Sequence, residues 1–558
     1  LSRYADRSTL PANVTLHDRK DMDAVQRELR EIRGVSVLIY DQTCAAEKRR
    51  RRKKKEYPDP NQRMFINEAV CEGCGDCGVQ SNCTSIMPLE TEFGRKRSID
   101  QSSCNKDFSC VKGFCPSFVT VEGGKLKKSK AGVAKEDDFG ALPDPVLPAC
   151  DLPFNILLNG IGGTGVITVG ALIGMAAHME GKGVSVLDMT GMSQKNGSVT
   201  SHIRIAQTPG KIRAQRIATG EADLILGCDM LTSGSHDAIS KMRAGRTRAV
   251  VNTHQQPTGH FAKDADWTFP IEQVQALIND SVDNHSDFID ATKLATALMG
   301  DSIATNLFML GFAVQKGAIP LSEVALLRAI ELNGVAVDSN KKSFLWGRRA
   351  AVDLARVEKI ALPTKTIVVQ MPQSLDNLIK RRVAVLTEYQ NEDYAAQYAS
   401  LVSKVRNAEA KLGSTRTENR LSTAVAKYYF KLMAYKDEYE VARLYTDGQF
   451  VDKLKQQFEG DFSLKFNLAP PLFAKKDDKG HLVKAQYGSW VWQGFKLLAK
   501  MKFLRGTKLD VFGYSAERKG ERQLIVDYRD TILGLLDTLS AGNLATAVEI
   551  AALPEKVR

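Results

Sequence analysis

A dense run of cysteines between residues 71 and 115 constrains this chain more than any other feature. Seven of its ten cysteines fall in that segment, which ends in a Cys-Pro pair: Cys71, Cys74, Cys77, Cys83, Cys104, Cys110 and Cys115. Two residues between successive cysteines let a tight turn direct three sulfurs at one centre, and a later Cys-Pro supplies a fourth. The spacing therefore favours an iron–sulfur cluster over the alternatives, a tetrahedral zinc site or disulfides.

The ligand pattern of ferredoxins divides these thiols into two groups. It assigns four of them to one [4Fe–4S] cluster: Cys71, Cys74, Cys77 and Cys115. The other three, Cys83, Cys104 and Cys110, leave a second cluster one ligand short. That cluster would be of the [3Fe–4S] type or would borrow Asp107 or Cys44, so whether there are one or two clusters stays open.

Composition and charge restrict the class of protein. With 558 residues the chain is long enough for three or four domains, and it has no apolar run that would span a membrane. Thiolate ligands indicate a reducing compartment, so a cytoplasmic location is expected. Much of the net charge of +12 lies in residues 48–55. We interpret this run as a solvated helix end or linker, with docking of an acidic electron carrier or a phosphorylated cofactor, and nucleic-acid binding, as alternatives.

The chain order predicts five segments. Residues 1–56, with a helix over 18–31 and a strand over 34–40, are expected to be the tail of an α/β domain. Because the chain starts without Met, it is expected to be a fragment. The cysteine module occupies 57–125, and a linker rich in Gly, Pro and Lys occupies 126–152. A second α/β domain is predicted over 153–365, and a mainly helical domain over 366–558, including one long helix at 424–445.

A glycine loop opens the second α/β domain. A strand over Asn155–Asn159 precedes the loop, and a helix over Val166–Met179 follows it. This order presents backbone N–H groups at a helix N-terminus to a phosphate, and Asp188 stands at the offset where a dinucleotide ribose would be held. The candidate residues of the loop are Gly160, Gly162, Gly163, Thr164 and Gly165. Close packing of helix on strand alone would also explain the glycines.

These signatures stand in an order that resembles the C-terminal part of the fused indolepyruvate:ferredoxin oxidoreductases, members of the 2-oxoacid:ferredoxin oxidoreductase family. The motifs that carry the resemblance are Tyr40–Arg52, Val70–Cys77, Gln101–Cys110 and Gly113–Phe118, and in the glycine-loop domain, which resembles the family's gamma domain, Gln194–Gly197 and Glu331–Val335.

The resemblance implies an α/β multidomain fold. It comprises a small ferredoxin-like iron–sulfur module, a doubly wound gamma-type α/β domain and a mainly helical C-terminal domain. Residues 1–56 would be the remnant of a thiamine-diphosphate-binding domain, and the parent enzyme is expected to be a homo-oligomer without membrane or nucleic-acid partners.

The implied activity is oxidative decarboxylation of a 2-oxoacid with thiamine diphosphate and Mg. Electrons would pass through [4Fe–4S] clusters to ferredoxin, and the acyl group would pass to coenzyme A. The thiamine-binding catalytic residues would lie outside this chain, and the phosphorylated cosubstrate would meet the glycine loop together with Lys195 and Asn196. The competing hypotheses are an NAD(P)-linked iron–sulfur oxidoreductase that uses Asp188, and a non-catalytic electron-transfer module.

Overall fold

The computed structural model describes residues 4, 6–113, 115–127, 139–191, 197–362, 374–412, 419–470 and 483–556. It divides into two compact units, residues 1–59 and 60–558. None of the helices in these described stretches combines the length and the apolar character that a membrane span requires.

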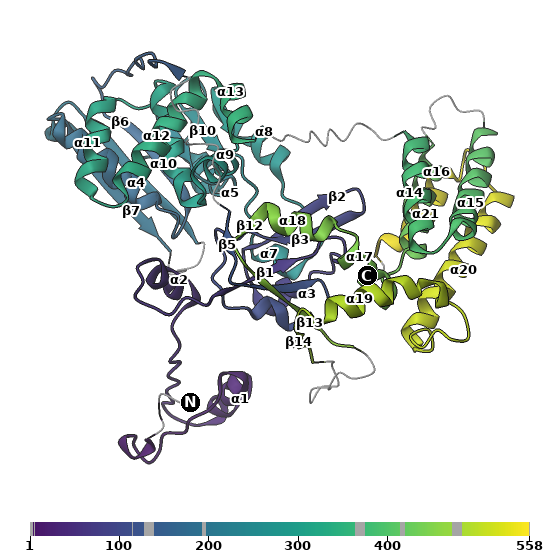
Figure 1. The fold of residues 1–558 in the computed structure, drawn as a ribbon. Helices are drawn as coiled ribbons and strands as arrows, with labels where there is room; N and C mark the ends of the chain where they lie inside the picture. The colour runs from purple at the N-terminus through teal and green to yellow at the C-terminus, as the bar shows by residue number, and fades with distance from the viewer. Residues whose placement is uncertain are drawn as a thin grey trace. The chain divides into compact units, whose positions relative to one another are not determined.

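The first unit is made of short helices joined by extended chain (Figure 1). They are η2 (Arg7–Thr9), η3 (Arg19–Asp21), α1 (Met22–Glu31) and α2 (Ala45–Lys53). Helix α1 confirms the helix expected over 18–31, and the basic run forms α2, where Glu47 pairs with Arg50 at 2.7 Å and Arg51 at 3.0 Å. The strand expected over 34–40 is wrong: within this described unit residues 35–40 join no sheet, and Val35 is 96% exposed. A β-branched segment needs a neighbouring strand to be held in a sheet.

A six-stranded sheet forms the centre of the α/β domain, in the order β11-β10-β9-β6-β8-β7. The strands are β6 (Phe154–Ile161), β7 (Gly183–Thr190), β8 (Ser198–Ala206), β9 (Leu224–Gly227), β10 (Arg248–Asn252) and β11 (Ser286–Ile289). Strands β6, β9, β10 and β11 are parallel, whereas β8 is antiparallel to both β6 and β7. The sheet is thus mixed, because β8 runs antiparallel to both of its neighbours.

Helices cover both faces of this sheet. One apolar core joins the sheet to α4 (Val166–Met179), α9 (Ala291–Met299), α10 (Thr305–Gln315), α11 (Glu323–Asn333), α12 (Val337–Val352) and α13 (Leu354–Ala361). A second core on the other face includes residues of α5 (Met230–Ser233), α6 (His236–Lys241) and α8 (Ile271–Ser281). The short helix α7 (Gly259–Lys263) lies in the connection between β10 and α8. The α/β class predicted for this domain is confirmed.

The cysteine-rich segment is built on a small antiparallel sheet. Strands β1 (Gln62–Ile66) and β4 (Phe118–Glu122) pair, and β2 (Ile86–Thr91) forms a hairpin with β3 (Gly94–Ile99). Helix α3 (Asp76–Ser81) carries Cys77 and the turn η4 (Ser109–Lys112) carries Cys110, while the other intervening cysteines lie in loops. The sheet continues into distant sequence, because β13 (Ser463–Leu468) pairs with β4 and β14 (Ala485–Tyr487) pairs with β13. Likewise β12 (Phe458–Glu459) pairs with β5 (Lys125–Leu126).

The C-terminal region is otherwise helical, as predicted. Its helices are α14 (Leu375–Tyr389), α15 (Glu392–Ala410), α16 (Arg420–Met433), α17 (Glu438–Thr446), α18 (Gln449–Gln457), α19 (Val491–Lys500), α20 (Ala516–Asp537), α21 (Leu544–Ala552), and the 3-10 turns η8 (Met501–Leu504) and η9 (Leu553–Lys556). The single helix expected over 424–445 is wrong. Helix α16 ends at Met433. Asp437 then caps the start of α17 by accepting a hydrogen bond from the backbone N–H of Glu440, and such a cap favours a new helix start.

Candidate functional site

The loop that follows β1 brings the first three cysteines together through two left-handed glycines. Gly73 has φ +73° and Gly75 has φ +83°, a region that residues with a side chain rarely adopt. A Cβ on Gly73 would lie 2.2 Å from the carbonyl oxygen of Arg95 on the β2–β3 hairpin. Only glycine therefore permits this close approach between loop and hairpin.

The four thiols assigned to one cluster from the sequence, the first group, interact electrostatically, and their role as ligands stays a prediction. Burial, followed by the nearby thiols of Cys71, Cys115 and Cys74, raises the pKa of Cys77 to about 12. Burial and then Cys71 raise the pKa of Cys115 to about 11.

The remaining three thiols form a second group beside the first. Burial raises the pKa of Cys110, with further contributions from Cys104, Cys83 and then Cys77. Burial also raises the pKa of Cys104, and Cys83 adds to that effect. Since Cys110 responds to Cys77, the two groups are neighbours.

The fourth ligand of a second cluster stays a hypothesis. Asp107 influences both Cys104 and Cys110, and its carboxylate accepts hydrogen bonds from the N–H of Ser109 at 3.3 Å and its hydroxyl at 3.0 Å. Cys44 belongs to the first unit, where it precedes α2.

The surroundings of the sulfurs fit an iron–sulfur cluster. The backbone N–H of Gly73 donates to Cys71 Sγ at 3.3 Å, and that of Lys106 donates to Cys104 Sγ at 3.4 Å. Hydrogen bonds of this kind tune cluster thiolates. Within the described residues no three His, Cys, Asp or Glu side chains converge closely enough to ligate one metal ion. The iron–sulfur cluster therefore stays a prediction from the spacing of the cysteines.

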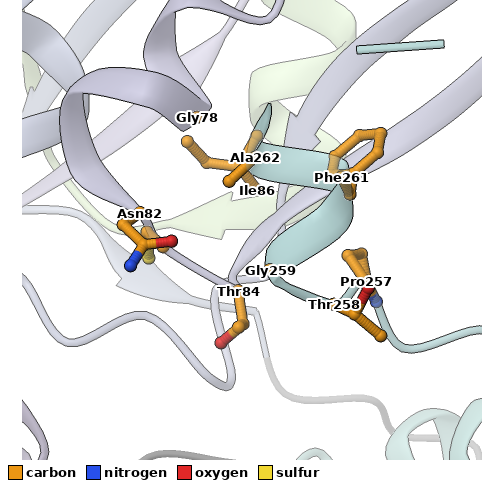
Figure 2. Close-up of a pocket in the computed structure, with 10 residues that line it drawn as sticks. Gly78, Asn82, Thr84, Ile86, Pro257, Thr258, Gly259, Phe261 and Ala262 are labelled. Atoms are coloured by element: carbon orange, nitrogen blue, oxygen red, sulfur yellow. The ribbon is translucent and has the colours of Figure 1, made fainter. Parts of the chain in front are cut away.

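The α/β domain packs against the cysteine loop through the segment around α7. Arg95 donates to the carbonyl oxygen of Trp267 at 2.8 Å, and Gln256 donates to that of Thr84 at 3.1 Å. A Cβ on Gly75 would lie 2.7 Å from Cβ of Ala265. Figure 2 shows a small pocket at this junction, where Gly78, Asn82, Thr84 and Ile86 face α7 residues such as Phe261 and Ala262; Cys83 also lines it.

The glycine loop lies at the carboxyl end of β6, beside the carboxyl end of β9, where the N–H of Cys228 donates to the oxygen of Asn159 at 2.8 Å. Gly160 is packed: a Cβ there would lie 2.8 Å from Val166 and 3.0 Å from Cys228. The N–H of Gly162 donates to Gly197 O at 2.7 Å.

The second half of the loop is open. Gly163 and Gly165 have φ +85° and +99°, and a Cβ on either would meet none of the described residues within 4 Å. Asn306 from α10 donates to the carbonyl oxygen of Thr164 at 3.1 Å, which fixes the turn that starts α4. Packing thus explains Gly160, while Gly163 and Gly165 present backbone toward open space.

Of the other residues predicted for the loop, Lys195 and Asn196 lie outside the described residues. The basic residue Arg204 on β8 lies at the end of β6 opposite to the loop, because it pairs in register with Asn155. Asp188 accepts a hydrogen bond from Ser201 on β8. Since β8 separates β7 from β6, Asp188 does not occupy the position beside the loop that a dinucleotide ribose requires.

Contacts from the C-terminal region to the cysteine segment were missed from the sequence. Lys436 donates to the carbonyl oxygen of Cys71 at 3.1 Å and pairs with Glu72 at 2.6 Å. Lys484 donates to the carbonyl oxygen of Val111 at 3.2 Å. No local signal in the sequence links residues this far apart.

Comparisons with known proteins divide the chain in the same places. Residues 155–350 match the family described as Pyruvate ferredoxin/flavodoxin oxidoreductase, and residues 375–558 match one described as Family of unknown function (DUF6537). The Indolepyruvate oxidoreductase subunit IorB of Pyrococcus horikoshii is 29% identical over 205 residues, which is 36% of this chain and 97% of that subunit. The same subunit of Methanothermobacter thermautotrophicus is 28% identical over 202 residues, 36% of this chain and 98% of its own length.

Among solved structures, pyruvate oxidoreductase subunit PORC of Thermotoga maritima covers 36% of this chain and 96% of its own, with 20% identity and a TM-score of 0.27. A score this low supports no further conclusion.

Proposed function

Residues 155–350 belong to the pyruvate ferredoxin/flavodoxin oxidoreductase family, which makes the chain a 2-oxoacid:ferredoxin oxidoreductase family member, and from this premise we propose that it is the electron-transferring part of an indolepyruvate-type enzyme. The complete reaction would be thiamine- and coenzyme A-dependent oxidative decarboxylation of a 2-oxoacid such as an arylpyruvate, with ferredoxin as the electron acceptor. The preference for an arylpyruvate rests on the relatives named as indolepyruvate oxidoreductase subunits.

The observation that carries this proposal is that seven cysteines, of which Cys71 and Cys77 are buried and the other five partly buried, interact electrostatically in two groups. The first group would hold a [4Fe–4S] cluster, and the second group would hold a further cluster completed by Asp107 or another ligand. Such clusters accept and release single electrons. The protein's own part is to bury the thiols, donate backbone hydrogen bonds to sulfur and keep the two groups side by side.

The glycine loop is proposed to receive the phosphate of coenzyme A or to contact the thiamine-binding part of the enzyme. Gly163 and Gly165 leave the first N–H groups of α4 approachable, because no side chain covers the loop at these positions. Lys195 and Asn196 are proposed to contact the same phosphate, on the basis of their place in the sequence. Thiamine chemistry itself would come from a partner domain or subunit.

Metal analysis and spectroscopy test the cluster assignment. Protein purified without oxygen should contain about four iron atoms per chain for one cluster, or roughly seven to eight for two, with matching acid-labile sulfide. Reduction should produce the EPR signal of [4Fe–4S]⁺. Stoichiometric zinc without iron would contradict the proposal.

The alternative, an NAD(P)-linked oxidoreductase, is less favoured because Asp188 bonds to Ser201 and β8 lies between β7 and β6. Bleaching of the cluster by NADH would support it. The other alternative is an electron-transfer module that has no enzymatic partner. Adding thiamine-binding domains of the family separates it from the first proposal, because restored 2-oxoacid oxidation would support the first proposal.

A further inference from the structure

A buried arginine on strand β3 lies against the first cysteine loop. The side chain of Arg97 is 1% exposed. Its guanidinium donates to the carbonyl oxygen of Lys96 at 3.2 Å and to that of Ala265 at 2.9 Å, and its centre lies 4.4 Å from the centroid of the Phe261 ring. The charge is therefore fixed between the hairpin and the α7 segment of the α/β domain.

Arg97 also lies beside the thiols. A Cβ on Gly75, the residue after Cys74, would be 3.6 Å from Arg97 Nη2. The guanidinium therefore lies against the backbone of the loop between Cys74 and Cys77.

A second cation, Lys484, approaches thiols of both groups from the C-terminal region. Its partly buried ammonium donates to the carbonyl oxygen of Val111, next to Cys110, and lies 5.3 Å from the centroid of the Phe118 ring. Cys115 and Cys77 are among the groups that act on its charge. Lys484 is thus held by backbone and ring contacts, as Arg97 is.

We propose that Arg97 and Lys484 are positioning residues that raise the reduction potential of the cluster held by the first thiol group. This inference rests on the iron–sulfur function proposed above. Reduction adds one negative charge to a cluster already bound by four thiolates. A fixed positive charge in a poorly solvated place stabilises that added charge, and its removal favours the oxidised form.

The test is a redox titration of the iron-loaded full chain, followed by the EPR signal of the reduced cluster. Replacing Arg97→Gln or Lys484→Gln should each lower the midpoint potential. A tenfold fall in the ratio of reduced to oxidised cluster at a fixed potential corresponds to about 59 mV for a one-electron couple. Arg97→Lys, which keeps the charge, should stay close to the unmodified protein.

Arg95→Gln is the matched control. Arg95 is on the same strand and bonds to the same segment of the α/β domain, through the oxygens of Trp267 and Asp266, and its loss should leave the midpoint unchanged. If Arg97→Gln loses its iron, Arg97→Lys is the deciding variant. Loss of iron from Arg97→Lys as well would mean that Arg97 is needed for folding, and would overturn its assignment.

The outcomes separate this inference from the proposed function. Unchanged midpoints in Arg97→Gln and Lys484→Gln, in protein that retains its cluster, would overturn the inference alone. Absence of iron from the unmodified chain would overturn the proposed function instead.

Discussion

Tyr445 donates a hydrogen bond of 2.7 Å to the carbonyl oxygen of Pro116, the residue that follows the last cysteine of the cluster segment. The tyrosine belongs to α17, and its ring packs against Phe450, Phe466 and Phe495 at centroid distances of 5.0, 5.1 and 5.3 Å. The C-terminal region therefore supports the backbone beside Cys115 directly.

Replacing Tyr445→Phe should keep the aromatic packing and remove this hydrogen bond. A buried carbonyl oxygen left without its donor costs about 1–3 kcal/mol, so the free energy of unfolding in denaturant should fall by that amount. Tyr514 is the control, because it makes a bond of the same length to Lys508 O but is 61% exposed. An equal effect of Tyr514→Phe would show that burial beside Pro116 does not matter.

Replacing one cysteine of either thiol group should remove the iron of that group. Cys74→Ala should abolish the [4Fe–4S]⁺ EPR signal of the first group, and Cys104→Ala should remove only the iron of the second. Cys150→Ala is the control, since Cys150 lies outside both groups and contacts Ile205 O. Iron content that is unchanged in Cys104→Ala would make the second group structural thiols.

Replacing Gly73, which lies close to the β2–β3 hairpin, should destabilise the protein more than backbone strain alone would. Gly73→Ala and Gly94→Ala both place a side chain at positive φ, +73° and +89°, but only the first would collide with Arg95 O. The strain common to both is worth roughly 1–2 kcal/mol. Thermal unfolding should show a clearly larger loss for Gly73→Ala, with impaired iron incorporation, and similar losses in both variants would contradict the contact.

Local sequence signals predicted the elements that depend on neighbouring residues. The helix expected over Val166–Met179 has those bounds in the structure, because the glycine loop and the apolar pattern both act within a few residues. The assignment of the cysteines to clusters stays a prediction from their spacing. The family resemblance is confirmed over residues 155–350.

Features that depend on distant residues were missed. Strand β13 joins β4 across 343 positions, as between Lys465 and Glu122, and no periodicity in either segment names its partner. The break between α16 and α17 depends on Asp437, whose carboxylate forms a buried ion pair with Arg505. Tertiary contacts of this kind override helix propensity.

His202 on β8 predicts a loss of stability in acid. Burial lowers its pKa from the ordinary 6.5, its Nδ1 accepts from the N–H of Ile217 at 3.2 Å, and the side chain is fully buried. The unfolded chain binds a proton below about pH 6.5 while the folded chain resists it, so stability is complete above that pH and falls below it. Between about pH 7.5 and 5.5 the chain should lose more stability than His202→Gln does. Parallel pH curves for the two proteins would contradict this assignment.

The open half of the glycine loop gives the last prediction. Gly163→Val places a branched side chain where backbone is proposed to meet a phosphate or a partner, in a conformation with φ +85°. In the reconstituted enzyme it should raise the coenzyme A concentration needed for half-maximal activity, or weaken assembly seen by size-exclusion chromatography, with the clusters intact. Gly181→Val is the matched control: Gly181 has φ +70°, its Cβ also meets nothing within 4 Å, and it follows the other end of α4. Equal behaviour of the two variants in both measurements would reduce the loop to a structural turn, whereas NADH binding that depends on Asp188 would assign the site to the dinucleotide alternative.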